Sequence, residues 1–371
     1  MGWIRKTFLY REDYNPALQG LRGVAVLWFF HMSFYGQFDP AKLTRITGGK
    51  PWLGDVINSL PILLSPGLIA PVLMYVLAGF LAVGSLEKSS FPRFLLARAL
   101  RFYPVYLVAV LPVLAYTNSG FSNIFQSLTF FVVPQDIPVG SLVVLAAAFW
   151  LPILWAGVQA ATKIFPNLTL QAGIFLACAG LNWMACRDFG TTIAFLGVFA
   201  GILAGVWAGV PTTRRKRHLP VLATRYGAGP CLVGAVVLAP FALKCLPSSF
   251  NAPAVACSIL LAWATASLAA FPASRTGRFL SHPVFRYFGA VALPFFLIHT
   301  TWGFRLSRSI LQGELQSIGA VVAHYAMSLA FSTVFAGFLH VFFERPHFLR
   351  NLRNGPPAAT KPGSDVRGAA V

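Results

Sequence analysis

The chain has 371 residues, of which 57% are apolar and only 11% are charged. A soluble protein covers its surface with about 25% charged residues, so this composition excludes a water-soluble fold and predicts an integral membrane protein. The net charge of +19 does not indicate nucleic-acid binding, because the basic residues lie in short connections between apolar runs and not along one polar face.

Apolar runs recur along the whole chain. A membrane-spanning helix needs about 20 mostly apolar residues, and ten runs approach that length. They predict one all-α bundle of about ten transmembrane helices. Their approximate ranges are 18–35, 62–84, 102–117, 140–159, 168–185, 190–210, 229–246, 253–271, 287–303 and 319–342.

The basic residues between these runs indicate their orientation. With the N-terminus inside, the inner connections hold 21 Lys and Arg residues and the outer connections hold 7. Cytoplasmic loops of membrane proteins carry such an excess, so both termini are expected in the cytoplasm. We predict a membrane domain over residues 1–348. Residues 349–371 combine Pro, Gly, Ala and charges and predict a disordered cytoplasmic tail.

The cysteines predict neither a metal site nor a disulfide framework. There are five, an odd number, they lie in or beside apolar runs, and none forms a CxxC pair. No bound cofactor is expected.

Few ionisable residues enter the apolar runs. All acidic residues fall in connections, in the tail or at the ends of runs, which disfavours a proton-coupled transporter. Ionisable side chains are costly in hydrocarbon, so those inside a run are functional candidates. A lone histidine is equally well explained as a core residue satisfied by one backbone carbonyl, whereas Arg22 and His31 share one short run. The candidates are Arg22, His31, His299, His324 and His340.

Three arginines precede the third run. Arg98 and Arg101 are three residues apart and share a helix face, with Arg93 one further turn away. Two interpretations stay open. Positive charge at this position anchors the topology of a membrane helix, and guanidinium groups also bind phosphate.

Five motifs in this order resemble the acyltransferase 3 family of membrane O-acyltransferases. The first is Asn15 to Ala25 (NPALQGLRGVA), followed by His31. The others are Val76 to Leu81 (VLAGFL), Arg98 to Pro104 (RALRFYP), Phe288-Gly289 ahead of Phe296 to His299 (FLIH), and Phe343 to Pro346 (FERP). Together they cover about residues 15 to 348.

The resemblance implies an enzyme that transfers acyl groups other than aminoacyl groups. Its donor would be a cytoplasmic acyl-CoA, commonly acetyl-CoA, used as co-substrate. Its acceptor would be a hydroxyl of a cell-surface or periplasmic carbohydrate or of a lipid-linked sugar. The expected location is a bacterial inner membrane, and a homo-oligomer is compatible with the sequence.

The resemblance also implies roles for individual residues. His31 matches a histidine thought to act as the base, and Arg22 matches the arginine of the same segment. Arg98 and Arg101 match a donor-binding pair, with Arg93 beside them. An imidazole near neutrality suits the removal of a hydroxyl proton, and arginines suit phosphates. Further candidates from the motifs are His299, as a relay or as core packing, Glu344 and Tyr103.

Two departures from the family pattern concern the first motif. Gln19 stands where the family has Asp, and only nine residues separate Arg22 from His31, which turns them to opposite sides of an ideal helix. They would converge if Gly20 and Gly23 broke the start of the helix. The alternatives are therefore a polysaccharide or lipid-precursor transporter or flippase, and an inactive scaffold. The acyl group, acetyl or succinyl, and the acceptor stay open.

Overall fold

The computed structural model describes residues 15–36, 69–86, 90–116, 148–157, 197–205, 226–244, 252–311 and 317–344. These residues form helices joined by short turns, and none of them is in a strand. The expectation of an all-helical, membrane-type chain is confirmed at this level. The apolar run at 168–185 and the boundary between residues 348 and 349 lie outside the described residues.

Two of the described helices are long and apolar enough to cross a membrane, namely Phe91–Pro112 and Ile318–Glu344. A third crossing results if the bent pair Pro283–Ala290 and Ala292–Ile310 is counted as one span. Ten spans and cytoplasmic termini stay predictions.

Helix α2 (Pro16–Tyr35) begins at a side-chain cap. The Asn15 side-chain oxygen accepts hydrogen bonds from the backbone N–H groups of Ala17 and Leu18 at 3.0 and 3.3 Å. Pro16 occupies the first turn, where no N–H is required. The Asn15 amide also donates to the carbonyl of Leu268 at 3.0 Å, so this residue both starts α2 and ties it to α12 (Ala252–Ala270).

Glycines let α2 approach α13 (Arg275–Leu280) and α14 (Pro283–Ala290) at backbone distance. A Cβ on Gly20 would overlap the carbonyl oxygen of Leu280, and one on Gly289 would overlap that of Gln19. Small residues at membrane-helix contacts have this role. The alternative in which Gly20 and Gly23 break the start of the helix is wrong, because α2 is continuous from Pro16 to Tyr35.

A second glycine contact joins α5 (Ile69–Leu86) to the helix at residues 197–205. Gly197, Gly201 and Gly205 are spaced four apart and all face α5. A Cβ on Gly201 would overlap the Val76 carbonyl, and one on Gly79 would overlap that of Val198. The VLAGFL motif therefore has a packing role.

Helix α6 (Phe91–Tyr116) begins well before residue 102, where the third span was expected. Arg93, Arg98 and Arg101 consequently lie within the helix and not in a loop ahead of it. The spacing of three between Arg98 and Arg101 does place them on neighbouring positions of one helix, as predicted.

The run predicted at 287–303 is a broken element. It consists of α14, a 70° bend, and then α15 (Ala292–Ile298), the π-helical segment η4 (His299–Gly303) and α16 (Phe304–Ile310). Pro294 explains the break, since it has no N–H to donate to residue 290 and its ring crowds that carbonyl. The last element, α17 (Ile318–Leu339), also ends in a π-helical segment, η5 (His340–Glu344).

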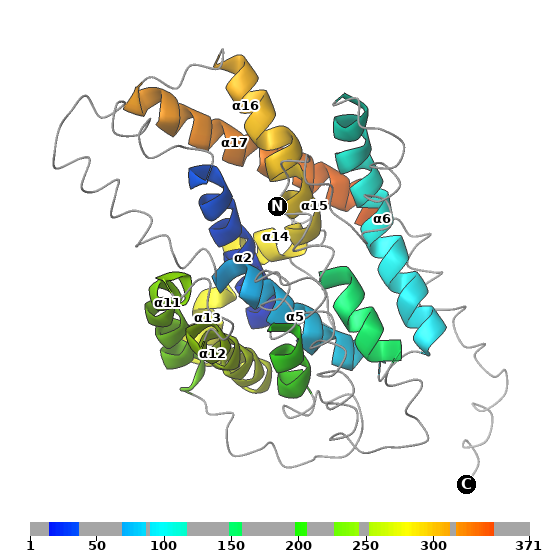
Figure 1. Cartoon of the computed structure of the whole chain (residues 1–371), viewed down its shortest axis with the longest axis vertical. Helices are drawn as coiled ribbons and strands as arrows, with labels where there is room; N and C mark the ends of the chain where they lie inside the picture. Colours follow the sequence, from blue (N-terminus) through cyan, green and yellow to red (C-terminus); the bar gives the residue numbers. More distant parts are fainter. Residues whose placement is uncertain are drawn as a thin grey trace, which may run out of the picture.

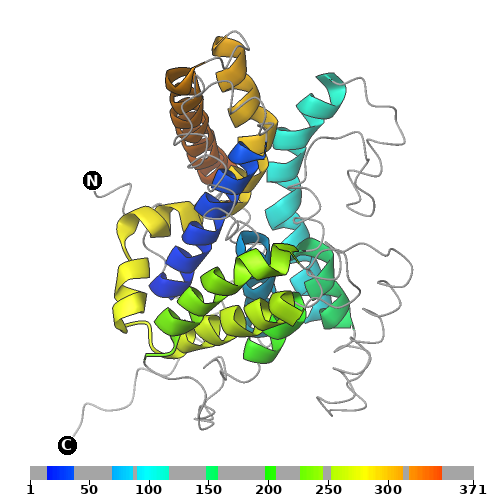
Figure 2. The ribbon, with the colours of Figure 1, turned by 60° about the vertical axis from the view of Figure 1, so that its left-hand side comes forward.

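Figures 1 and 2 show how these helices are arranged. The pair α16 and α17 lies side by side at one end, and α11 (Ala228–Lys244) and α12 lie side by side at the other. Helix α2 runs between the two ends and contacts α5, α14 and α15. Aromatic residues of α2, α15 and α16 form a compact core around Phe30, Phe295 and Phe304. The candidate residues from the sequence lie on α2, α6, η4, α17 and η5.

Candidate functional site

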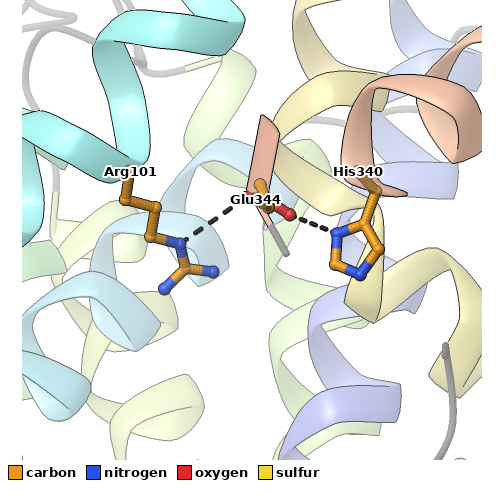
Figure 3. A network of polar contacts seen from close by, with 3 residues as sticks. All are labelled: Arg101, His340 and Glu344. Atoms are coloured by element: carbon orange, nitrogen blue, oxygen red, sulfur yellow. Dashed lines mark hydrogen bonds and ion pairs between the residues drawn. The ribbon is translucent and has the colours of Figure 1, made fainter. Parts of the chain in front are cut away.

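Glu344 is the centre of a polar network at the end of η5 (Figure 3). Its Oε1 lies 3.6 Å from Nε of Arg101 on α6. Its Oε2 pairs with Nδ1 of His340, one π-helical turn earlier. The Glu344 side chain is only 6% exposed, whereas that of Arg101 is 36% exposed. A buried carboxylate is therefore shared between an imidazole and a half-exposed guanidinium.

Arg22 supplies a third basic group to the same end of the molecule. From α2, its charge acts on both Glu344 and Arg98. The positive charges of Arg98 and Arg101 also act on one another. Arg22, Arg98, Arg101 and Glu344 thus converge from α2, α6 and η5, although they are far apart in the sequence.

Arg98 has partners of its own. Its Nε donates to the Phe149 carbonyl at 3.1 Å, and its Nη2 donates to the Ala148 carbonyl. Its guanidinium also lies over the rings of Phe94 and Phe102, at 5.7 and 5.4 Å from their centroids. These contacts join α6 to the start of the helix Ala148–Gly157. Arg98 therefore holds two helices together in addition to contributing charge.

The other two α6 candidates lie apart from the Glu344 network. Arg93 is exposed. Tyr103 is partly buried and packs edge-on against Phe149, with the ring centroids 5.8 Å apart. Neither residue has a described contact with Glu344.

His31 forms a separate pair with Tyr325 of α17. Its Nδ1 lies 2.6 Å from the Tyr325 phenol oxygen, and the two rings are edge-on with centroids 5.2 Å apart. Both side chains are partly buried. Nothing in the sequence pattern marks Tyr325, which follows His31 by 294 residues.

His299 is buried in an aromatic cage at the start of η4. Its Nδ1 lies 3.0 Å from the Phe295 carbonyl oxygen, and since a carbonyl only accepts, Nδ1 carries the proton. Its Nε2 has no hydrogen-bond partner among the residues that the structure describes. Five phenylalanine rings surround the imidazole, those of Phe29, Phe30, Phe295, Phe296 and Phe304.

A buried polar cluster joins α16 to α17. The Ser307 hydroxyl lies 2.8 Å from Nδ1 of His324 and 2.6 Å from the Ser328 hydroxyl. The Ser307 hydroxyl also donates to the backbone carbonyl of Gly303 at 2.9 Å. Hydrogen bonds of this kind hold membrane helices together, which gives His324 a structural role.

Arg22 and His31 have different partners, as their spacing on α2 predicted. Nine residues of helix rise about 14 Å and turn through half a circle. Arg22 faces the network of Glu344, and His31 contacts α17 near its beginning. His340 was a candidate from its place in an apolar run, and its spacing of four from Glu344 agrees with their contact. Tyr325 is the polar partner that the sequence did not identify.

The arrangement has two chemical capabilities. Arg101 and Arg22 act on a single carboxylate, that of Glu344, and the charge of Arg98 acts on both arginines. The group therefore carries excess positive charge and suits an anion such as a phosphate. Along α2, an imidazole and a phenol share one hydrogen bond and suit proton transfer. Within the described segments, no three His, Cys, Asp or Glu side chains gather in one place.

Comparison with known proteins gave no match to a protein-family model, to a curated protein or to a solved structure.

Proposed function

We propose that this protein is a membrane O-acyltransferase that moves an acetyl or succinyl group from a cytoplasmic acyl-CoA to a hydroxyl of a cell-surface or periplasmic carbohydrate. The observation that carries the proposal is the convergence of Arg22, Arg98, Arg101 and Glu344. These residues come from three of the motifs that resemble acyltransferase 3 proteins, and their charges act on one another from α2, α6 and η5.

The basic group is the proposed site for the donor's phosphates. Arg101 is the leading ligand, because its side chain is partly exposed and its pairing distance of 3.6 Å to Glu344 is longer than that of a hydrogen bond. Arg22 adds charge from the facing helix. Arg98 has its guanidinium occupied by two backbone carbonyls and contributes mainly by holding α6 in place.

His31 is the proposed base. It stands about 14 Å further along α2 than Arg22, by the rise of an α-helix. Coenzyme A carries its phosphates and its thioester at opposite ends of a long flexible arm, so such a separation between a phosphate site and the reacting centre suits this donor. The orientation expected from the basic residues would put the arginines at the cytoplasmic side.

Lipid nanodiscs test the proposal, because they leave both faces of the membrane open to the donor and to the extracytoplasmic acceptor. Nanodiscs containing the wild-type chain receive [14C]acetyl-CoA together with envelope polysaccharide from a strain that lacks the gene. We expect base-labile label in the polysaccharide, and a loss of at least about 100-fold in rate for His31→Gln, as for removal of a general base. His282→Gln is the matched control, because His282 is exposed on the turn before α14. Wild-type nanodiscs that leave the polysaccharide unlabelled would overturn the proposal.

A transporter or flippase is the second candidate, and the 70° bend between α14 and α15 is the observation that favours it. Discontinuous membrane helices commonly line substrate sites in transporters. Liposomes containing the chain would then move a labelled lipid-linked sugar across the bilayer without any acyl-CoA. Movement of the labelled lipid-linked sugar, with no label transferred from acetyl-CoA, would support the transporter function and contradict the enzyme function.

A further inference from the structure

The hydrogen bond between His31 and Tyr325 decides which atom of the pair meets a substrate. The two residues lie on α2 and α17, and the phenol oxygen of Tyr325 stands 2.6 Å from Nδ1 of His31. Neither side chain is fully buried. The pair therefore joins α2 to α17, and part of each side chain stays exposed.

Aromatic packing holds the Tyr325 ring in this position. Phe30 and Phe34 of α2 contact it edge-on, with centroids 5.4 and 5.0 Å from that of Tyr325. Phe304 in turn packs on both phenylalanines. Edge-to-face contacts of this kind have a defined geometry. The phenylalanine rings therefore hold the Tyr325 ring so that its phenol oxygen points at His31.

The chemistry of the two groups fixes the direction of the bond. A phenol hydroxyl is a good donor and its oxygen a weak acceptor, whereas the unprotonated nitrogen of a neutral imidazole is a good acceptor. The hydroxyl of Tyr325 therefore donates to Nδ1, and Nε2 of His31 carries the ring's own proton. The basic lone pair of His31 is then the one that Tyr325 already covers.

We propose, resting on the acyltransferase function above, that Tyr325 is a catalytic residue that relays the acceptor's proton to His31. The acceptor O–H gives its proton to the phenol oxygen while the Tyr325 proton passes to Nδ1 of His31. The acceptor oxygen forms its bond to the thioester carbonyl carbon, and the carbon–sulfur bond breaks. The CoA thiolate leaves and takes the proton from the imidazolium, so the products are an ester and free CoA thiol.

This arrangement differs from direct base catalysis by His31. In a direct mechanism the substrate meets an imidazole lone pair, and Tyr325 only orients the ring. In the relay, the phenol oxygen touches the substrate and His31 acts behind it. Tyr325→Phe removes the phenol oxygen and so distinguishes the two mechanisms, because direct base catalysis by His31 tolerates that loss far better than the relay does.

The test compares Tyr325→Phe with Tyr287→Phe in the full-length chain in lipid nanodiscs, with [14C]acetyl-CoA and envelope polysaccharide. Tyr287 is a matched control, since its phenol donates across helices to the Thr333 carbonyl at 3.1 Å and does not contact His31. We expect Tyr325→Phe to lower kcat by at least about 100-fold, the usual range for proton transfer, with the KM for acetyl-CoA within about twofold of wild type. Tyr287→Phe should keep kcat within about threefold of wild type, since an interhelical hydrogen bond in a membrane is worth little.

Two results of this assay would overturn the relay. If wild type transfers label and Tyr325→Phe matches its kcat, the relay fails while the acyltransferase function stands. If wild type transfers no label, the function fails and the relay with it. Solid-state 15N spectra of the wild-type chain give a check that needs no variant, with His31 assigned through Phe30 and Met32. A protonated Nδ1 contradicts the relay, and an unprotonated Nδ1 supports it.

Discussion

Nε of Arg101 lies 3.6 Å from Oε1 of Glu344, a contact that joins α6 to the end of η5. Glu344 is buried and also pairs with His340. Removing one partner of a buried charge pair leaves the others uncompensated. The carboxylate therefore holds Arg101 and His340 together, and it also attracts the charge of Arg22.

Neutralising this carboxylate should destabilise the fold. Glu344→Gln keeps the side-chain shape but leaves Arg22 and Arg101 without their common counter-charge. We expect a loss of about 1–3 kcal/mol, at the lower end because water screens the half-exposed Arg101. The measurement is the thermal midpoint in detergent. Arg93→Gln is the control, since Arg93 is exposed on the same helix and surface changes cost within about 0.5 kcal/mol. Equal midpoints for the two variants would show that Glu344 does not organise the network.

Arg98→Lys and Arg101→Lys should have different effects on stability and on CoA binding. Arg98 donates to two carbonyls and covers two phenylalanine rings, a geometry that the point charge of lysine does not reproduce. Arg98→Lys should lower the thermal midpoint and leave the CoA affinity of the folded protein within about threefold, as expected for a residue whose contacts are structural. Arg101→Lys should weaken CoA binding by about tenfold, equivalent to 1.4 kcal/mol. Isothermal titration with CoA in nanodiscs measures both affinities. The reverse pattern would make Arg98 the donor ligand.

The first motif is a good example of what the sequence could and could not predict. The apolar run predicted at 18–35 covers most of α2, whereas the cap by Asn15 and the start at Pro16 were not predicted. Helix breaking was the only role considered for Gly20 and Gly23, whereas these glycines allow α2 to touch α13 and α14. A pattern within one helix contains no information on which neighbour lies against it, so this role required the three-dimensional arrangement.

The sequence likewise identified some residues of the candidate site and missed others. Arg22, Arg98 and Arg101 were identified from charge and spacing, because ionisable residues are rare in an apolar chain, whereas Glu344 was identified from the resemblance of its motif. Tyr325 is one of ten tyrosines, in an apolar helix with no charge near it. Its contact with His31 depends on how α17 crosses α2, which no local rule predicts. The bend before α15 follows from Pro294, yet proline alone does not give the 70° angle.

The α2–α14 contact should tolerate no added methyl group. A Cβ on Gly289 would overlap the backbone carbonyl of Gln19, which cannot move without shifting α2. We expect Gly289→Ala to cost about 1–3 kcal/mol or more, as overpacking does. Gly157→Ala is the matched control, because no atom of the described residues lies within 4 Å of its Cβ position, and alanine there should be neutral or stabilising by up to about 1 kcal/mol. Thermal midpoints of the two variants compare them directly. If Gly289→Ala is as stable as wild type, the two backbones are further apart than described.

His299 should show opposite effects on stability and on activity. Its Nε2 is buried among phenylalanine rings and has no hydrogen-bond partner among the described residues, which costs about 1–3 kcal/mol. His299→Phe removes that cost, and it gives up a hydrogen bond to a carbonyl that also accepts from the backbone N–H of residue 299. We expect a thermal midpoint equal to or above that of wild type.

The sequence leaves two roles open for His299, a proton relay and core packing. The relay role predicts that the same variant loses acyl transfer by at least about tenfold, because the variant removes the group that carries the proton. Phe29→Leu, from the same aromatic cage, is the control for packing alone. It should lower the midpoint and leave the rate within about threefold, since the lost ring contacts carry no proton chemistry. A wild-type rate for His299→Phe would instead assign His299 to the core, where its nitrogen serves no step of the reaction.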